Sequence, residues 1–555
     1  AQARCSALLV SVVMAAAAST SGAAPLGLWR PQLAGAAATT PVRRQQPLVL
    51  PAPLAIARSQ RGRCRVVLAA AAAAEEPFRD GDARVAVVGA GPVGLFAALV
   101  LARRGFRRIR VLDRLREPPG TADTDAWGDV TRSYNIGLGG RGQASLAAGG
   151  ALERVDRWCK TVVGRRDWPA NGGPPAETMT NRRYLTKIIA RDRLTSCLLE
   201  ELREAHPEVA IEFGVGCSRV DFGREGGTVR LDMQHCRRSG SEGCEVEEGA
   251  TFTVEADFVV GADGVNSTIR DEMASAGAAC RAHRLEDLRP TTYRTISIPV
   301  PEGERTDFNF SARNGDIGIE ALPNVEGQVC GVFLFEPDDT RVTSLADGRA
   351  ARKLFEELFP IWPTPLLSDE EFEAFAHRPN AKLPQFMFCG PELHRGGQAV
   401  LLGDAIHSVK PYFGLGVNSA FEDVVVLGRC LDETGGRLDQ ALPLFSTKRA
   451  EEARALVESQ YTLDQPADYR FVAKFLLPII LDNVFNKALP QVFSPNLIVM
   501  LQDEAYTFQE VRQKKALDRT LQAAVLLPLG AGILGAGTSA LGALVSAIAE
   551  RIPAA

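Results

Sequence analysis

Glycines and carboxylates occur at three places along this chain with spacings that suit a nucleotide site. The first place is residues 84–114, which contain Gly89-x-Gly91-x-x-Gly94 and end just after Asp113. Gly89 permits a tight turn, Gly91 lets the backbone approach a pyrophosphate, and Gly94 lets a helix pack closely on a strand. A carboxylate roughly twenty residues further on is placed to bind a ribose hydroxyl. This stretch therefore predicts a dinucleotide site.

Two further carboxylates follow short apolar runs and glycine turns in the same way. Asp263 lies in Gly-Ala-Asp-Gly after the run Phe-Val-Val, and Asp404 follows Gly403 after the run Val-Leu-Leu. Each run predicts a buried strand that delivers its carboxylate to a turn before a helix. The helix expected from Gly416 offers free backbone N–H groups to an electron-rich ligand. The combination favours one shared ligand over unrelated buried turns.

Three basic residues stand near these turns. Arg191 begins a predicted helix, where the helix dipole disfavours a cation, so we favour a phosphate or cofactor contact. Arg141, in a glycine-rich stretch, lies either near phosphate or substrate or in a remote loop. His407 is expected to order its loop rather than to catalyse. No other His, Asp or Cys grouping suggests acid–base or nucleophilic catalysis, and we predict no metal site.

An α/β scaffold is needed to bring these residues together. Residues 84–114 have the pattern of a strand, a glycine turn, a helix and a second strand, which opens a Rossmann-type fold. Residues 281–390 alternate apolar and polar side chains over short runs, as antiparallel strands do. From about residue 451 the pattern is helical. We therefore predict a Rossmann-type domain, an inserted antiparallel sheet that covers the substrate, and a helical C-terminal region.

Composition excludes several classes of function. With 555 residues, of which 46% are hydrophobic and 23% charged, the chain can bury the cores of about two or three domains. Its net charge of −4 provides no basic surface for nucleic acid. The 11 cysteines form no CxxC pair and no Cys/His cluster with zinc spacing. We expect reduced structural thiols rather than a disulfide framework.

Both ends of the chain differ from its middle. No Asp, Glu or Lys precedes Glu75, whereas Arg recurs among Ala, Ser, Thr and Pro, a composition typical of transit peptides. An apolar run at residues 7–18 adds a signal-like core, so we expect import into a plastid, with a mitochondrial presequence or an unaddressed arm as alternatives. Residues 521–549 are uncharged and long enough to span a bilayer. A membrane anchor is favoured there, with a buried apolar helix as the alternative because of Pro528 and the many Ala and Gly residues.

The three motifs, in this order, resemble those of the FAD-dependent aromatic hydroxylases over residues 84–520. Within that family, residues 321–324 and 411–423 are most similar to the kynurenine 3-monooxygenases. The resemblance implies that the Rossmann-type domain binds FAD. The predicted boundaries are a targeting leader at 1–75, an FAD-binding domain at 76–280 and 391–450, a substrate-covering sheet at 281–390, a helical region at 451–520 and a membrane-associated segment at 521–549.

The resemblance also assigns roles to individual residues. The three fingerprint glycines would hold the pyrophosphate, Asp113 the adenosine ribose and Asp404 the ribityl chain, while backbone N–H groups at the start of the helix from Gly416 would meet the flavin ring. The expected cofactor contacts are Gly89, Gly91, Gly94, Asp113, Arg114, Arg191, Asp263, Gly403, Asp404, Gly416, Val417 and Asn418.

Substrate contacts follow from the resemblance less directly. Arg165 or Arg166 is expected to bind a substrate carboxylate, and Tyr412 and Phe413 to line the pocket. Phe333 and Phe335 are pocket candidates that equally suit an ordinary core.

The implied reaction is carried out by the cofactor. NADPH would dock transiently and reduce FAD, and O₂ would then form a flavin C4a-hydroperoxide that hydroxylates or epoxidises a small aromatic or hydrophobic substrate. A single Rossmann fingerprint leaves no second site of that type for NADPH. Two alternatives stay open: a plastid flavin reductase of isoprenoid chains, and a non-catalytic flavoprotein.

Overall fold

The computed structural model describes residues 80–128, 133–170, 172–180, 182–224, 226–240, 243–464 and 469–535. They all belong to one unit, Ala1–Ala23 with Phe78–Ala555, and a second unit, Ala24–Pro77, lies outside them. The predicted leader and the part of the predicted membrane segment beyond residue 535 are likewise outside the described residues.

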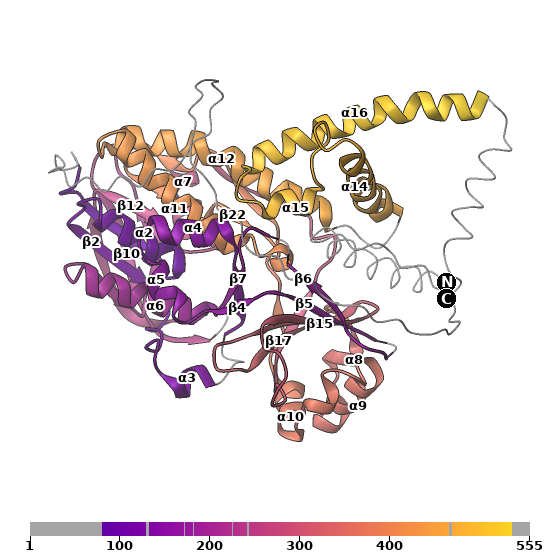
Figure 1. The fold of residues 1–555 in the computed structure, drawn as a ribbon. Coiled ribbons are helices and arrows are strands. Elements are labelled where there is room, and N and C mark those ends of the chain that lie inside the picture. Colours follow the sequence, from indigo (N-terminus) through magenta and orange to yellow (C-terminus); the bar gives the residue numbers. More distant parts are fainter. Residues whose placement is uncertain are drawn as a thin grey trace, which may run out of the picture. The chain divides into compact units, whose positions relative to one another are not determined.

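A six-stranded sheet carries the three predicted turns (Figure 1). Its order is β20-β21-β12-β1-β2-β8, and the strands from β21 to β8 run parallel, so their carboxyl ends meet at one edge. Their apolar residues are buried because helices cover the sheet, with α2 (Pro92–Ala102) packed against α6 (Arg191–Ala205) and α11 (Gly416–Glu433). The strands are β1 (Arg84–Val88), β2 (Arg108–Asp113), β8 (Ala210–Phe213), β12 (Phe258–Gly261), β20 (His394–Arg395) and β21 (Ala399–Leu401).

A seven-stranded sheet forms the predicted substrate domain, in the order β18-β14-β17-β16-β15-β5-β6. Three helices and a buried aromatic cluster cover one of its faces (Figure 1). The strands are β5 (Gly164–Pro169), β6 (Ala176–Met179), β14 (Thr292–Ile298), β15 (Phe308–Asn314), β16 (Ile317–Pro323), β17 (Val329–Phe335) and β18 (Ala381–Lys382), and the helices are α8 (Thr340–Thr343), α9 (Gly348–Leu358) and α10 (Asp369–His377). Two of these strands, β5 and β6, come from outside the predicted range 281–390. They join because β5 pairs in parallel with β15.

Three small sheets and short helices complete this part of the molecule. Their orders are β3-β7-β4, β11-β10-β9 and β13-β19-β22. The strands are β3 (Asn135–Leu138), β4 (Lys160–Val162), β7 (Thr186–Ala190), β9 (Val215–Asp221), β10 (Val229–Gly240), β11 (Gly243–Ala256), β13 (Cys280–Arg284), β19 (Met387–Pro391) and β22 (His407–Ser408). The helices are α3 (Thr124–Gly128), α4 (Gly140–Ala148), α5 (Leu152–Asp156) and α7 (Thr268–Ser275).

Cysteine pairing departs from expectation at one position. Cys236, on β10, is disulfide-bonded, so the expectation of reduced thiols is wrong there. The free cysteines of the described residues are Cys159, Cys197, Cys217, Cys280, Cys330, Cys389 and Cys430.

The chain is helical after α11, as its sequence pattern predicts. Helix α12 packs against both α11 and α16. These elements are α12 (Leu438–Leu463), α13 (Tyr469–Phe471), a π-helical turn (Val472–Leu476), α14 (Leu477–Ala488), α15 (Leu497–Gln502) and α16 (Phe508–Gly535). Over the described ranges, the last of which ends with α16, no helix is both long and apolar enough to cross a bilayer.

Candidate functional site

The fingerprint glycines form a turn that is tight on one side and open on the other. Gly89 has φ +106°, and a Cβ there would lie 2.3 Å from the carbonyl oxygen of Ala262. A Cβ on Gly94 would lie 1.8 Å from the Gly89 oxygen, whereas a Cβ on Gly91 would meet no atom within 4 Å. Gly91 caps α2 without a side-chain hydrogen bond. Free N–H groups therefore face open space at a helix N-terminus, which suits a pyrophosphate.

Asp113 connects this turn to the end of β2. Its carboxylate accepts hydrogen bonds from the Ala90 N–H at 2.5 Å and from the Leu115 N–H at 2.7 Å. The carboxylate is thus fixed beside the glycine turn, and its remaining lone pairs are free for a ribose hydroxyl. Arg114 follows with an exposed side chain.

Arg191 lies where the fingerprint and the third motif meet. Its backbone N–H donates to the Tyr134 carbonyl at 3.1 Å, at the start of α6. Burial alone would lower the pKa of the Arg191 guanidinium, but neighbouring acids outweigh it and raise that pKa. These acids are Tyr134, Asp192, Asp404 and Asp113. Residues nearly 300 positions apart in sequence thus act on one cation.

The second motif presents an unsatisfied carboxyl oxygen. Ser267 caps α7 by accepting from the Arg270 N–H, and Asp263 Oδ2 accepts from the Ile269 N–H at 3.2 Å. The other oxygen, Asp263 Oδ1, is buried and has no hydrogen-bond partner within the described part of the chain. Burial raises the pKa of Asp263. The backbone of Asp263 adjoins the fingerprint turn, since a Cβ on Gly89 would lie 3.0 Å from the Asp263 nitrogen, which fits the position expected near the pyrophosphate.

Asp404 follows a glycine in the left-handed region. Gly403 has φ +64°, and its N–H donates to Asp423 Oδ2 at 3.1 Å. The side chain of Asp404 is exposed at its surface, yet desolvation by the surrounding protein raises the pKa of its carboxyl. The nearby His407 and Arg191 lower that pKa but offset only part of the increase. The third motif therefore presents an acceptor next to Arg191.

The N-terminus of α11 supplies backbone donors. Within this helix, Ser419 is the first residue whose N–H donates to a backbone carbonyl, that of Leu415, at 2.9 Å. The N–H groups of Gly416, Val417 and Asn418 precede it and are free for a ligand. The Asn418 side chain accepts from the Gly139 N–H at 2.9 Å and is therefore used for structure.

A buried ionic cluster supports the third motif, and the sequence analysis did not identify it. Asp423 accepts from His407 Nε2 at 2.9 Å and from Arg449 at 2.6 Å. Arg449 also pairs with Glu422 at 3.0 Å, and Glu422 pairs with Arg141 at 3.1 Å. The guanidinium of Arg141 is therefore engaged in this cluster and not free for a phosphate or substrate. The only sequence signal was the pair of acids inside an otherwise apolar helix.

The helix-free face of the seven-stranded sheet holds the substrate candidates. Arg165 donates to Asp167 at 2.6 Å, to Ser311 at 2.7 Å and to Glu320 at 3.1 Å, so its charge is already neutralised. Arg313, on β15, has no hydrogen bond or ion pair in the described residues. It lies in electrostatic reach of Glu320, Arg165 and Tyr412, and burial lowers its pKa.

The other substrate candidates divide between the two sides of this sheet. Tyr412 and Phe413 lie in a short 3₁₀ turn directly before α11, and Tyr412 is 43% exposed. Arg166 points to the helix-covered face, where it pairs with Glu177 and Glu304. Phe333 and Phe335 pack on that face too, in the aromatic core with α9 and α10. Successive residues of a strand face opposite ways, which separates Arg165 from Arg166.

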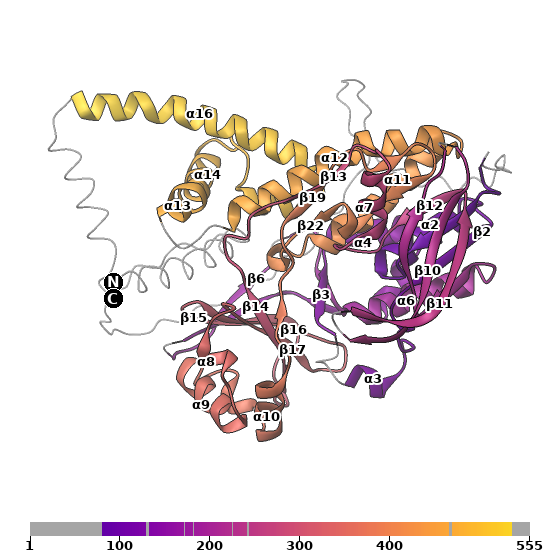
Figure 2. The ribbon, with the colours of Figure 1, turned by 180° about the vertical axis from the view of Figure 1, so that it is seen from behind.

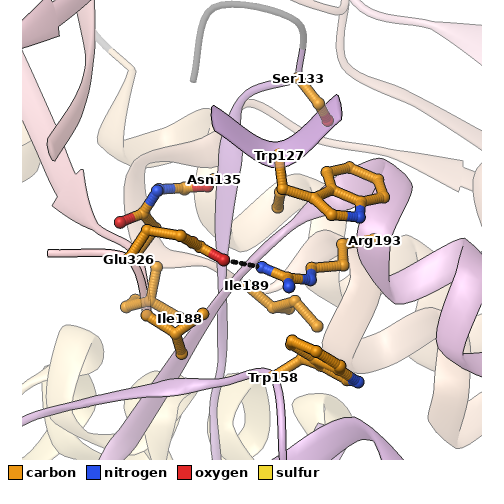
Figure 3. A pocket seen from close by; sticks show the side chains of 11 residues that line it. Trp127, Ser133, Asn135, Trp158, Ile188, Ile189, Arg193 and Glu326 are labelled. Carbon is orange, nitrogen blue, oxygen red and sulfur yellow. Dashed lines mark hydrogen bonds and ion pairs between the residues drawn. The ribbon is translucent and has the colours of Figure 1, made fainter. Parts of the chain in front are cut away.

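A separate small hollow lies beside α6 and is too small for a cofactor. Figure 3 shows Arg193 between Trp127 and Trp158, with an ion pair to Glu326. The cavity measures about 20 Å³, enough for a water molecule or two. We interpret Arg193 as a structural cation.

Comparisons with known proteins agree with this geometry. Residues 82–124 and 210–460 match the family model of the FAD binding domain. The kynurenine 3-monooxygenase of Salinispora arenicola is 29% identical over 480 residues, which cover 84% of this chain and 97% of that protein. The enzyme of the same name from Salinispora tropica is 30% identical over 358 residues, covering 63% and 72%, and that of Candida albicans is 26% identical, covering 81% and 94%.

Solved structures extend the likeness to the fold. The tetrameric form of 2-methyl-3-hydroxypyridine-5-carboxylic acid oxygenase has a TM-score of 0.53 and 22% identity, covering 74% of this chain and 99% of that one. The p-nitrophenol 4-monooxygenase of Pseudomonas putida has a TM-score of 0.52 and 16% identity, covering 79% and 98%.

Proposed function

Because the chain belongs to the family of FAD-dependent aromatic hydroxylases, we propose that this monooxygenase uses NAD(P)H and O₂ to hydroxylate a small aromatic substrate. The observation that carries the proposal is the meeting of three motifs at one edge of the six-stranded sheet. Gly89 of the first motif lies against Ala262 of the second, and the strands before all three motifs are neighbours. Asp113 and Asp404 both act on Arg191. The chain's own residues then divide the work of binding, shielding and selection.

The residues present fit FAD. The open side of the glycine turn would receive the pyrophosphate, Asp113 the ribose, and Asp404 the chain that leads to the ring. When bound, FAD would supply hydride acceptance and oxygen activation. The free N–H groups at Val417 and Asn418 would stabilise negative charge on a ligand beside α11. The seven-stranded sheet would exclude water from this space.

Substrate selection is assigned to the helix-free face of that sheet. Arg165 is neutralised by its ion pairs with Asp167 and Glu320, whereas Arg313 makes no hydrogen bond or ion pair among the described residues. A free, partly desolvated arginine favours an aromatic substrate that carries an anionic group. Several relatives are kynurenine 3-monooxygenases, and the carboxylate of kynurenine would meet this requirement.

The decisive experiment follows the flavin of the purified protein under anaerobic conditions. We expect NADPH to bleach the flavin faster when an aromatic acid is present, and admission of O₂ to yield a product heavier by one oxygen atom in mass spectrometry. Saturation of an isoprenoid double bond without O₂ would instead support a reductase. A flavin that NADPH never bleaches, with any compound, would contradict the enzymatic proposal.

The same assay distinguishes the roles of Arg313 and Arg165 in substrate binding. We expect Arg313→Met to weaken binding of aromatic acids by roughly 10- to 150-fold, as for a lost charged hydrogen bond, and to leave neutral aromatics unaffected. If Arg165→Met alone has that effect, the assignment to Arg313 is wrong.

Two proposals on location rest on the sequence ends. Import into a plastid rests on the acid-free leader, and membrane association rests on the uncharged segment 521–549. Localisation of a fluorescent fusion to the leader would test the first.

A further inference from the structure

Two buried cysteines face each other where the chain passes between its two large sheets. The chain leaves the six-stranded sheet through β13 and returns to it through β19, and these strands pair antiparallel (Figure 2). Cys280 lies on β13 and Cys389 on β19. Both are fully buried in the core of the FAD-binding domain. Their Sγ atoms are 2.8 Å apart.

The two sulfur atoms are near each other but too far apart to be bonded. A disulfide requires an S–S distance of about 2.05 Å, so the two sulfurs must approach by roughly 0.8 Å. In the ladder Cys389 lies opposite Ala282, two positions from Cys280, so the two cysteines are diagonal neighbours. Cα atoms on such a diagonal are about 7–8 Å apart, beyond the usual 4.4–6.8 Å of a disulfide. Bond formation must therefore pull the two strands together.

We propose that Cys280 and Cys389 are a redox modification site that closes to a reversible disulfide. Two S–H bonds break and one S–S bond forms, while two electrons and two protons pass to the oxidant. With hydrogen peroxide as oxidant the balance is two thiols plus one H₂O₂ to one disulfide plus two H₂O. A small dithiol can reduce the closed bond by thiol–disulfide exchange. In the resting state, contact with Cys389 and burial raise the pKa of Cys280, which favours its thiol form.

Two hydrogen bonds connect the cysteine pair to the loop that follows Asp404, so formation of the disulfide would move that loop. The Cys389 N–H donates to the carbonyl of Ile406 at 2.6 Å. Arg270 lies in α7, close to Cys280 of β13, and donates to the carbonyl of Ala405 at 3.3 Å. Ala405 and Ile406 directly follow Asp404. Pulling β13 and β19 together thus displaces the loop that presents Asp404, and oxidation changes the affinity for FAD.

The test uses the full chain with FAD bound and needs no turnover, so it is independent of the proposed reaction. The protein is treated with hydrogen peroxide, the remaining thiols are blocked with iodoacetamide, and the digest is searched for a peptide pair joined through Cys280 and Cys389. Free FAD is measured by its fluorescence after dilution. We expect the joined pair, and a change of roughly 5- to 150-fold in the dissociation constant of FAD, a typical range for coupled sites. Dithiothreitol should reverse both.

Matched variants decide the assignment. Cys280→Ser and Cys389→Ser should each abolish the joined peptide and the response of FAD affinity to peroxide. Cys430→Ser, at another buried thiol of the same core, should keep both. Oxidation of Cys159 or Cys217 without the joined pair would overturn the proposal. A joined pair without any change in FAD affinity would overturn the coupling to the Asp404 loop.

Discussion

At the scale of single residues, Asp423 holds the third motif in place. It is buried, and it binds the Gly403 N–H, His407 and Arg449 at once. Asp423→Asn leaves Arg449 without a full counter-charge inside the protein, which typically costs about 3–5 kcal/mol of unfolding free energy. Urea denaturation at neutral pH measures this loss. The exposed pair of Asp432 with Arg104 is the control, because Asp432→Asn should cost about 1 kcal/mol or less.

The same carboxylate predicts a pH dependence. Burial alone would raise the pKa of Asp423, but Arg449 and His407 outweigh it and lower that pKa below its usual value. Asp423 therefore contributes stability that is complete above the unfolded-state pKa of about 3.9 and is lost as pH falls through the lower folded-state value. The stability difference between the native protein and Asp423→Asn should shrink below about pH 4. An unchanged difference in acid would contradict the ion-pair account.

Two glycines of the fingerprint should respond differently to the same added methyl group. Gly94→Ala places a Cβ 1.8 Å from the Gly89 oxygen, so we expect a destabilised or unfolded protein. Gly91→Ala meets no atom within 4 Å, and its φ of −68° suits alanine. Its melting temperature without FAD should be unchanged, while FAD affinity falls by about tenfold or more, equivalent to about 1.4 kcal/mol. Unaltered affinity in Gly91→Ala would place the pyrophosphate elsewhere.

At the scale of elements, Arg141 joins three segments that are far apart in the chain. From α4 it pairs with Glu422 on α11, donates to the carbonyls of Asp503 and Tyr506 between α15 and α16, and lies over the Phe508 ring. Arg141→Met should loosen the C-terminal helices by removing these bonds together. Limited chymotrypsin digestion should then cut faster after Tyr506, between α15 and α16. Arg157→Met, at an exposed pair with Glu153, should not alter the digestion.

Local patterns predicted the elements well and their long-range partners poorly. The strand, turn and helix around Gly89 and the turn before Asp404 are readable because period and glycine spacing are properties of adjacent residues. The addition of β5 to the seven-stranded sheet is not readable, because strand pairing across more than 100 residues leaves no local mark. For the same reason Arg166 could not be told from Arg165. Asp423 was missed because its partner Arg449 lies on another helix.

At the scale of the whole molecule, one region of the described chain exposes an unusual number of large apolar side chains. They gather in α13, the π-helical turn, α14 and the loop after it: Tyr469, Val472, Leu477, Ile480, Val484, Leu489 and Val492, each at least 40% exposed. An apolar group of this kind on a water-exposed surface indicates a binding face. Helix α14 packs against α16, and residues 521–535 of α16 belong to the uncharged segment 521–549. We therefore expect this face to lie on a lipid surface.

Flotation with phosphatidylcholine vesicles tests that expectation on the full chain. The double change Ile480→Glu and Val484→Glu replaces two side chains that are 45% and 59% exposed, so the fold should be kept. Burying one such apolar side chain contributes roughly 1.5–3 kcal/mol, so vesicle binding should fall by at least about tenfold. Ile361→Glu changes an equally exposed residue of the sheet domain and should leave binding intact. Equal flotation of the double variant and the native chain would restrict attachment to the segment beyond α16, whereas no flotation of the native chain would contradict membrane association itself.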